Sequence, residues 1–259
     1  MDDQTSKWLW KGIESLKKMK ILAIDTSGLC LNIAIFNSDT NFFLQHTDSK
    51  IEKRAHSRNI LLEIIKLFKK AKWNFFELNK VILTSGPGSF TGLRIGATVA
   101  KIISDQCSCQ LCPVSTLKTI AFSHHTKKNL DKIPFINARN NNAFCMSLKS
   151  NGKIIMPEAH RPFNLFISKI FRPSCFICEK GTDNDFKDKI KAKGFALLEV
   201  SAPNLINAQA LIDLGRKVSS VNPTNFKPNY LRKTAAEMRW IKKHPKDAEK
   251  ASKKYVSEI

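Results

Sequence analysis

VILTSGPGSFTGLRIG spans residues 81–96, and this stretch decides the fold. The apolar run over 81–83 predicts a buried strand, and a glycine-rich turn follows at 86–88. A helix is expected to open between Ser89 and Gly92. Because a strand, a glycine turn and a helix present bare amide groups and a helix N-terminus, this segment is either a ligand cradle or a contact surface.

The spacing of the turn excludes three common glycine-loop chemistries. A Walker loop needs a lysine and a hydroxyl after its last glycine, but Gly92 is followed by leucine and arginine. The dinucleotide fingerprint needs glycine at the sixth position from Gly86, where this chain has Thr91. A nucleophile elbow needs glycine two residues on either side of its serine, and Ser89 lacks both.

The helix that follows carries small residues at every fourth position, namely Gly88, Gly92, Gly96 and Ala100. These residues fall on one stripe of the helix, where another backbone can approach closely. Glycine inside a helix costs about 1 kcal/mol relative to alanine, so the repetition indicates a packing reason. The stripe either packs onto the chain's own sheet or receives a partner helix.

Composition suits a globular protein. The chain has 259 residues, 42% of them hydrophobic, which predicts one or two compact domains with a core. We find neither a membrane-spanning apolar run nor a signal peptide, so a cytoplasmic protein is predicted. The first eighteen residues contain a Trp8-Leu9-Trp10 cluster and resemble a short amphipathic helix added to a chain that starts at Met19.

The net charge of +21 suggests nucleic-acid binding. However, the chain is rich in Lys, Asn, Ile and Phe throughout, a bias that AT-rich coding can produce. Residues 227–259 form a basic tail with Tyr230, Trp240 and Tyr255 interleaved. A solvated helix face explains this tail about as well as an RNA-facing one.

Seven cysteines, an odd number without a secretion signal, predict reduced thiols. The spacings of Cys107, Cys109 and Cys112, and of Cys175 and Cys178, only partly match zinc-ribbon pairs. Small apolar filler is the favoured interpretation over a structural zinc ion, so no metal is expected.

Two similar halves follow each other along the chain. The first half is predicted to contain strands at 21–24, 31–36 and 42–45 and a helix at 55–70. A strand at 81–83, a helix to 104, and a strand and helix over 112–123 are predicted to follow. The second begins alike, with strands at 133–136, 143–148 and 154–155, and a helix near 208–218 closes it. The repetition predicts an internal duplication.

This order predicts a two-lobed α/β protein of the actin-like and sugar-kinase-like (ASKHA) class, with duplicated β-β-β-α-β-α units. The expected organisation is an N-terminal extension at 1–18, a first lobe at 19–123, a second, degenerate lobe at 124–226 and a basic tail at 227–259.

In that class the polar turn of each lobe holds a phosphate, and a carboxylate in each turn helps to hold Mg²⁺. The first turn contains Asp25, Thr26 and Ser27, but the second has Asn137 and Arg139, and asparagine supplies no negative charge. These five residues predict at most a vestigial nucleotide site, with no catalytic residue and no cofactor.

Several motifs together resemble the TsaB (YeaZ) family. The resemblance covers roughly residues 19–233, and its most specific part is the eleven-residue segment GPGSFTGLRIG at 86–96. The other matching segments are ILAIDTS at 21–27, HS at 56–57, VSTL at 114–117, NAR at 137–139 and YLR at 230–232. The chain departs from the family at three positions. It has Asn137 where the family usually has Asp, Asn142 where it has Glu, and Phe144 where it has Tyr.

The resemblance implies a bacterial, non-catalytic subunit that partners the related catalytic subunit TsaD, joined by the ATPase TsaE. Together they transfer a threonylcarbamoyl group from its adenylate to N6 of the adenosine beside the anticodon, in tRNAs that read codons starting with A. Members pair with themselves when alone, tRNA is reached through the complex, and no membrane is involved.

The resemblance also places the partner contact on the first two helices, at 55–70 and 91–104. The expected interface residues are His56, Ile60, Ile64, Gly88, Phe90, Thr91, Gly92, Leu93, Gly96 and Ala100.

Two other functions stay open. One is an enzyme of the same architecture, a small-molecule kinase or a metallopeptidase-like protein, which needs a second turn carboxylate or a paired-histidine metal site. The other is an RNA-binding module, which the diffuse charge and the basic tail favour.

Overall fold

The computed structural model describes residues 18–48, 55–127, 129–232 and 243–244. The predicted N-terminal helix with its tryptophans, and nearly all of the basic tail beyond Arg232, lie outside the described residues. None of the described helices is both long and apolar enough to cross a membrane.

The first lobe is built on a five-stranded mixed sheet in the order β3-β2-β1-β4-β5. Its strands are β1 (Lys20–Asp25), β2 (Leu31–Asn37), β3 (Phe42–Asp48), β4 (Lys80–Gly86) and β5 (Gln110–Ser115). The first three strands form the expected antiparallel meander, and β4 and β5 join parallel to β1. Strands β1, β2 and β4 are apolar on both faces because helices cover both sides of this sheet.

The second lobe repeats this sheet. Its strands are β6 (Asp131–Asn137), β7 (Asn142–Leu148), β8 (Ile154–Pro162), β9 (Ser174–Glu179) and β10 (Ala196–Val200). Their order, β8-β7-β6-β9-β10, has the same antiparallel and parallel pairings as the first sheet. The predicted duplication is therefore confirmed, and the ends of β1 and β6 occupy equivalent positions.

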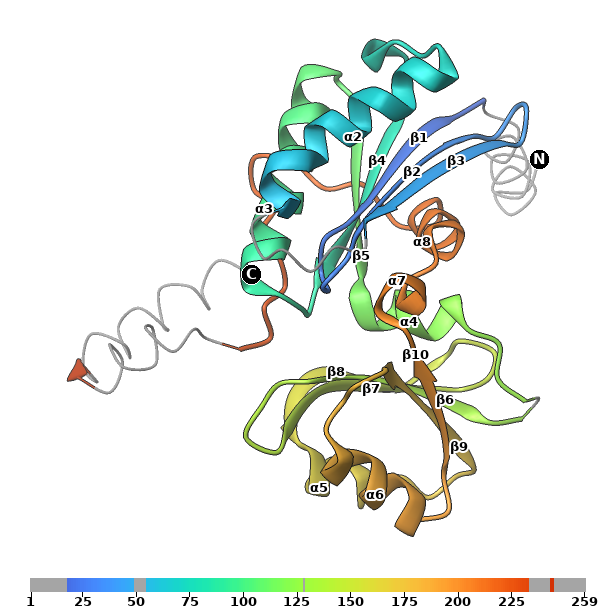
Figure 1. Ribbon diagram of the computed structural model, residues 1–259, viewed down its shortest axis with the longest axis vertical. Helices are drawn as coiled ribbons and strands as arrows, with labels where there is room; N and C mark the ends of the chain where they lie inside the picture. The colour runs from blue at the N-terminus through green and yellow to red at the C-terminus, as the bar shows by residue number, and fades with distance from the viewer. Residues whose placement is uncertain (1–17, 49–54, 128, 233–242, 245–259) are drawn as a thin grey trace, which may run out of the picture.

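Helices cover the sheets in layers (Figure 1). On one face of the first sheet lie α2 (Ala55–Ala71) and α3 (Phe90–Gln106), packed on a shared core. The other face receives α8 (Ala208–Gly215), although its residues fall in the range expected for the second lobe. Helices α4 (Thr116–Ser123) and α7 (Ala202–Leu205) lie between the lobes, and α5 (Phe163–Ile167) and α6 (Asn184–Ala192) cover the outer face of the second sheet.

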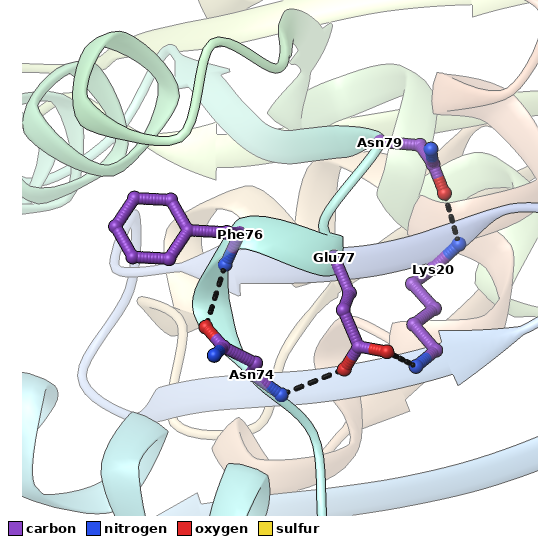
Figure 2. A network of polar contacts seen from close by, with 5 residues as sticks. All are labelled: Lys20, Asn74, Phe76, Glu77 and Asn79. Atoms are coloured by element: carbon purple, nitrogen blue, oxygen red, sulfur yellow. Dashed lines mark hydrogen bonds and ion pairs between the residues drawn. The ribbon is translucent and has the colours of Figure 1, made fainter.

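A polar network ties the short 3-10 helix η1 (Phe75–Glu77) to the start of β1 (Figure 2). The Glu77 carboxylate accepts from the Asn74 backbone at 2.7 Å and from Lys20 Nζ at 2.8 Å. The hydrogen bond from Lys20, followed by the one from Asn74, lowers the pKa of Glu77. The network fixes the connection between α2 and β4, while the Phe76 ring points away from it into solvent.

The glycine stripe of α3 packs inside the molecule, against the turn that follows β1. A side chain at Gly92 would collide with the Thr26 carbonyl oxygen, and one at Gly96 would collide with the Thr26 hydroxyl. The Thr26 hydroxyl donates to the Gly92 carbonyl at 2.8 Å, and Ser89 N–H donates to the Ser27 carbonyl at 2.7 Å. The stripe therefore serves the chain's own fold, and its interpretation as the seat of a partner helix is wrong.

Replacing Gly96 by leucine is expected to destabilise the fold, because the added side chain displaces the turn beneath it. Overpacking of this kind typically costs about 1–3 kcal/mol, which denaturant unfolding of the isolated chain measures directly. Thr98→Leu, two residues along α3 on its exposed face, is the matched control and should leave the midpoint nearly unchanged. Equal midpoints for both variants would contradict the packing role.

Candidate functional site

A cleft of about 650 Å³ lies between the lobes, and both polar turns reach it. Ser27 and Gly28 enter from the first turn, and Asn137 and Arg139 from the second. The remaining lining residues come from the turn between β1 and β2, from the start of α3 and the residues just before it, from β6 and the turn after it, from β7 and β9, and from the segment after α8; they are Leu29, Gly88, Ser89, Phe90, Ile136, Ala138, Phe144, Glu179, Tyr230 and Arg232. The structure thus brings the two expected turns together.

Asp25, the carboxylate of the first turn, is buried and fully engaged by its own lobe. Its Oδ1 accepts from Ser27 N–H at 3.0 Å, Ser27 Oγ at 2.6 Å and Thr84 Oγ1 at 2.8 Å. Its Oδ2 accepts from Asn32 Nδ2 at 3.0 Å. A carboxylate offers about four lone-pair sites, so little capacity remains for a metal ion or its waters. Asp25 ties together the ends of β1, β2 and β4.

The second turn offers backbone and cation but no carboxylate. Asn137 Oδ1 accepts from Arg139 N–H at 2.8 Å, which closes a local turn. Arg139, Asn140 and Asn141 all have left-handed φ, between 50° and 67°. Asparagine tolerates this conformation better than most residues, so the turn holds Arg139 at the rim of the cleft in an uncommon backbone geometry.

Of the five residues expected at the nucleotide site, Thr26 lines neither the cleft nor a smaller cavity beside it. Its hydroxyl is bonded to α3 instead. Ser27, Asn137 and Arg139 line the cleft, whereas Asp25 lines only the smaller cavity, of about 40 Å³. Within the described ranges, no three His, Cys, Asp or Glu side chains gather as metal ligands would.

Sequence reasoning did not identify Glu179 as a cleft residue. Burial raises the pKa of its carboxyl group, which lines the cleft beside the two polar turns. A half-buried carboxylate in the lining of the cleft opposes the binding of a phosphate there. A predicted strand at 174–179 would have revealed it. Glu179 would then end a strand of the second lobe, at the position where β4 of the first lobe leads into the glycine turn.

Most of the predicted interface residues are not available for docking. Ile60, Ile64, Leu93 and Ala100 are buried in the core of the first lobe, as are Gly92 and Gly96 in the stripe. Phe90 and Gly88 are half-buried and line the cleft, and Thr91 is exposed. His56 lies in the first turn of α2, but its side chain falls outside the described part of the structure. The prediction is wrong for these six buried residues.

The same two helices nevertheless expose a different set of apolar side chains, which we call the helical face. It comprises Leu61, Leu62 and Ile65 of α2 and Ile102 of α3, which are between 38% and 58% exposed. Helices α2 and α3 contact each other on the same side of the sheet, as Figure 1 also shows. Large apolar side chains exposed on adjacent helices are typical of a protein interaction surface.

Comparison with known sequences places the chain among proteins of tRNA modification. The family described as TsaD, tRNA N6-adenosine threonylcarbamoyltransferase, matches residues 49–168. A protein named tRNA threonylcarbamoyladenosine biosynthesis protein TsaB from Bacillus subtilis (strain 168) is 28% identical, over 86% of this chain and 98% of its own length. The Haemophilus influenzae protein of the same name is 21% identical, over 88% and 98%.

Transferase relatives match over less of their length. A tRNA N6-adenosine threonylcarbamoyltransferase from Wolbachia pipientis subsp. Culex pipiens is 34% identical, over 32% of this chain and 29% of its own. Among solved structures, YeaZ from Pseudomonas aeruginosa matches with a TM-score of 0.64 and 19% identity, over 81% of this chain and all of that one.

Two duplicated five-stranded sheets facing a cleft define a two-lobed protein of the actin-like (ASKHA) class. The relatives matched over nearly their whole length carry the name TsaB, and the structural match carries the name YeaZ. These full-length matches support the TsaB (YeaZ) family, which the motifs predicted.

Replacing Glu179 by glutamine is expected to stabilise the isolated chain at neutral pH. Since burial raises its folded-state pKa, the native carboxyl contributes stability below its ordinary pKa and loses it as the pH rises through the raised value. The variant should therefore unfold at higher temperature than the native chain at pH 7.5, and this difference should vanish toward about pH 4. Asp188→Asn, an exposed acid on α6, is the control. A pH-independent difference would contradict this account.

Proposed function

We propose that this chain acts in the formation of N6-threonylcarbamoyladenosine in tRNA, as a non-catalytic subunit that binds a TsaD-like catalytic subunit, with a TsaE-like ATPase joining them. The names of its full-length relatives support the pathway. The hydrogen bonds that occupy the Asp25 carboxylate, and the neutral Asn137, favour a non-catalytic role. A phosphate-bound Mg²⁺ would lack a carboxylate ligand in both turns.

The observation that carries the proposal is the helical face. Leu61, Leu62, Ile65 and Ile102 stay exposed although other apolar positions of α2 and α3 are buried. Burying such side chains against a partner is favourable by roughly 25 cal/mol per Å² of apolar surface, less the cost of association. The partner that fits is an apolar helical surface, and a second copy of this chain presents one as well.

An enzymatic role is the alternative. A kinase-like or metallopeptidase-like activity would use the cleft, where Arg139 and Arg232 supply positive charge at the rim. The half-buried carboxyl of Glu179 in the cleft and the fully hydrogen-bonded Asp25 favour the non-catalytic role instead. Turnover of ATP by the isolated chain that disappears in Asp25→Asn would favour the enzyme.

A charge on the helical face should break the complex. Leu62→Asp combined with Ile102→Asp is expected to weaken binding to a TsaD-like subunit by about 30-fold or more, the loss typical of interface hot spots, because each carboxylate would be buried against apolar surface. The same double variant should turn the self-associated chain into a monomer. Calorimetry and light scattering measure the two effects.

Leu165→Asp is the matched control, because Leu165 is an equally exposed leucine on α5 of the other lobe. It should leave both affinities unchanged. Equal losses for the control and the test variant, or unchanged binding by the test variant, would remove the helical face from the proposal.

Reconstitution tests the function as a whole. With tRNA, the threonylcarbamoyl donor, a TsaD-like subunit and a TsaE-like ATPase, modified adenosine should accumulate when this chain is present and fall to background without it. Mass spectrometry of digested tRNA measures the product. Full activity without the chain would contradict the proposal.

A further inference from the structure

The segment after α8 forms a strap that reaches both lobes. We define the strap as residues 222–232; in Figure 1 it runs past α3 toward the second lobe. Phe226 packs on the core that α2 and α3 share with the first sheet. Leu231 packs on the cluster that contains Ala138 and Phe144 of the second lobe. One apolar anchor thus enters each lobe.

The middle of the strap is clasped by both lobes at one residue, Asn229. Its backbone N–H donates to the Ser85 carbonyl of β4 at 2.7 Å. Its Nδ2 donates to Glu158 Oε1 of β8 at 2.8 Å, and the other oxygen of Glu158 accepts from Ser115 Oγ at the start of α4. Glu158 therefore joins the strap, the second sheet and the first lobe.

The strap fits closely against β4 because Gly86 has no side chain. A Cβ at Gly86 would collide with the Asn229 carbonyl oxygen, and its φ of 114° lies in the region that glycine adopts readily. The glycine-rich segment 86–96 therefore faces two neighbours. Gly92 and Gly96 face the β1 turn, while Gly86 faces the strap.

Further contacts hold the strap along α3 and at its far end. Lys101 Nζ donates to the carbonyls of Thr224 and Phe226 at 3.1 and 3.3 Å. The Tyr230 and Phe90 rings lie 4.3 Å apart. Arg232 Nη1 donates to the Ala138 carbonyl in the second turn at 2.8 Å.

Within the part of the chain that the structure describes, two other passages connect the lobes. The chain leaves the first lobe through α4 and returns from α7 to α8. Helices α4 and α7 lie between the sheets (Figure 1). Connections confined to one region permit one lobe to swing against the other, as in hinged domain pairs. The strap is bonded instead to β4, α3 and the second turn, at the rim of the cleft.

We propose that the strap is an interlobe latch, in which Asn229, Leu231 and Arg232 are the positioning residues that fix the angle between the lobes. The latch holds the second turn against the start of α3 and keeps the cleft at one width. The inference goes beyond the proposed function and does not depend on a catalytic partner.

Distance measurement by pulsed electron paramagnetic resonance on the isolated chain tests the latch. Spin labels at Lys70→Cys on α2 and Lys191→Cys on α6 report on the two lobes, since both residues are exposed. Burial raises the pKa of all seven native thiols, so the engineered cysteines react first, and identically treated native protein sets the background. Dilution with unlabelled chain isolates distances within one molecule.

The native latch should give one narrow distance distribution. Leu231→Ala with Arg232→Ala should broaden it and lengthen its mean, and Arg232→Ala alone, a change at an exposed residue, should broaden it to a smaller extent. Arg232→Lys should restore the narrow distribution, because one donor still reaches the Ala138 carbonyl. Lys227→Ala is the control, since Lys227 is an exposed strap residue. A double variant as narrow as the native chain, with an unchanged mean, would overturn the latch.

Discussion

The close approach of α3 to the turn after β1 is the contact on which the rest of the structure depends. Thr26 and Ser27 lie directly beneath the first turns of the helix, bonded to the Gly92 carbonyl and the Ser89 amide. Only residues without a Cβ allow this separation at Gly92 and Gly96. The contact fixes this turn, and the turn orients the Asp25 carboxylate toward Asn32 and Thr84.

This arrangement explains why a protein with an actin-like architecture presents so little of the usual cleft chemistry. The hydrogen bonds of the Asp25 carboxylate join β1, β2 and β4. The end of β6, which is equivalent to the end of β1, carries Asn137. The cleft has a volume of about 650 Å³ and two arginines at its rim, but Glu179, whose pKa burial raises, also lines it. A pocket of suitable volume is therefore not by itself a sign of nucleotide chemistry.

The helical face and the strap both involve α3. The helical face uses the side chains that the core does not need, and the strap uses Phe90 and Lys101 along the same helix. Since one 17-residue helix contacts the β1 turn, the strap and solvent, its placement links the cleft to the outer surface. Because these interfaces are packed, small shifts in one are expected to be felt in the others.

Sequence alone determined the element order of the first lobe, the duplication, the family and the absence of a second turn carboxylate, because apolar periodicity and turn residues are local properties. It did not reveal α5, β9, α6 or β10, which are between five and nine residues long and too short for apolar periodicity to separate helix from strand. Periodicity showed that Gly88, Gly92 and Gly96 share a stripe, but it did not show what that stripe meets. Only the tertiary structure decided that its neighbour is Thr26, that Asp25 is saturated, and that the strap joins both lobes. Each of these contacts pairs residues far apart along the chain, as Asn229 pairs with Ser85 and Glu158, and no local pattern encodes them.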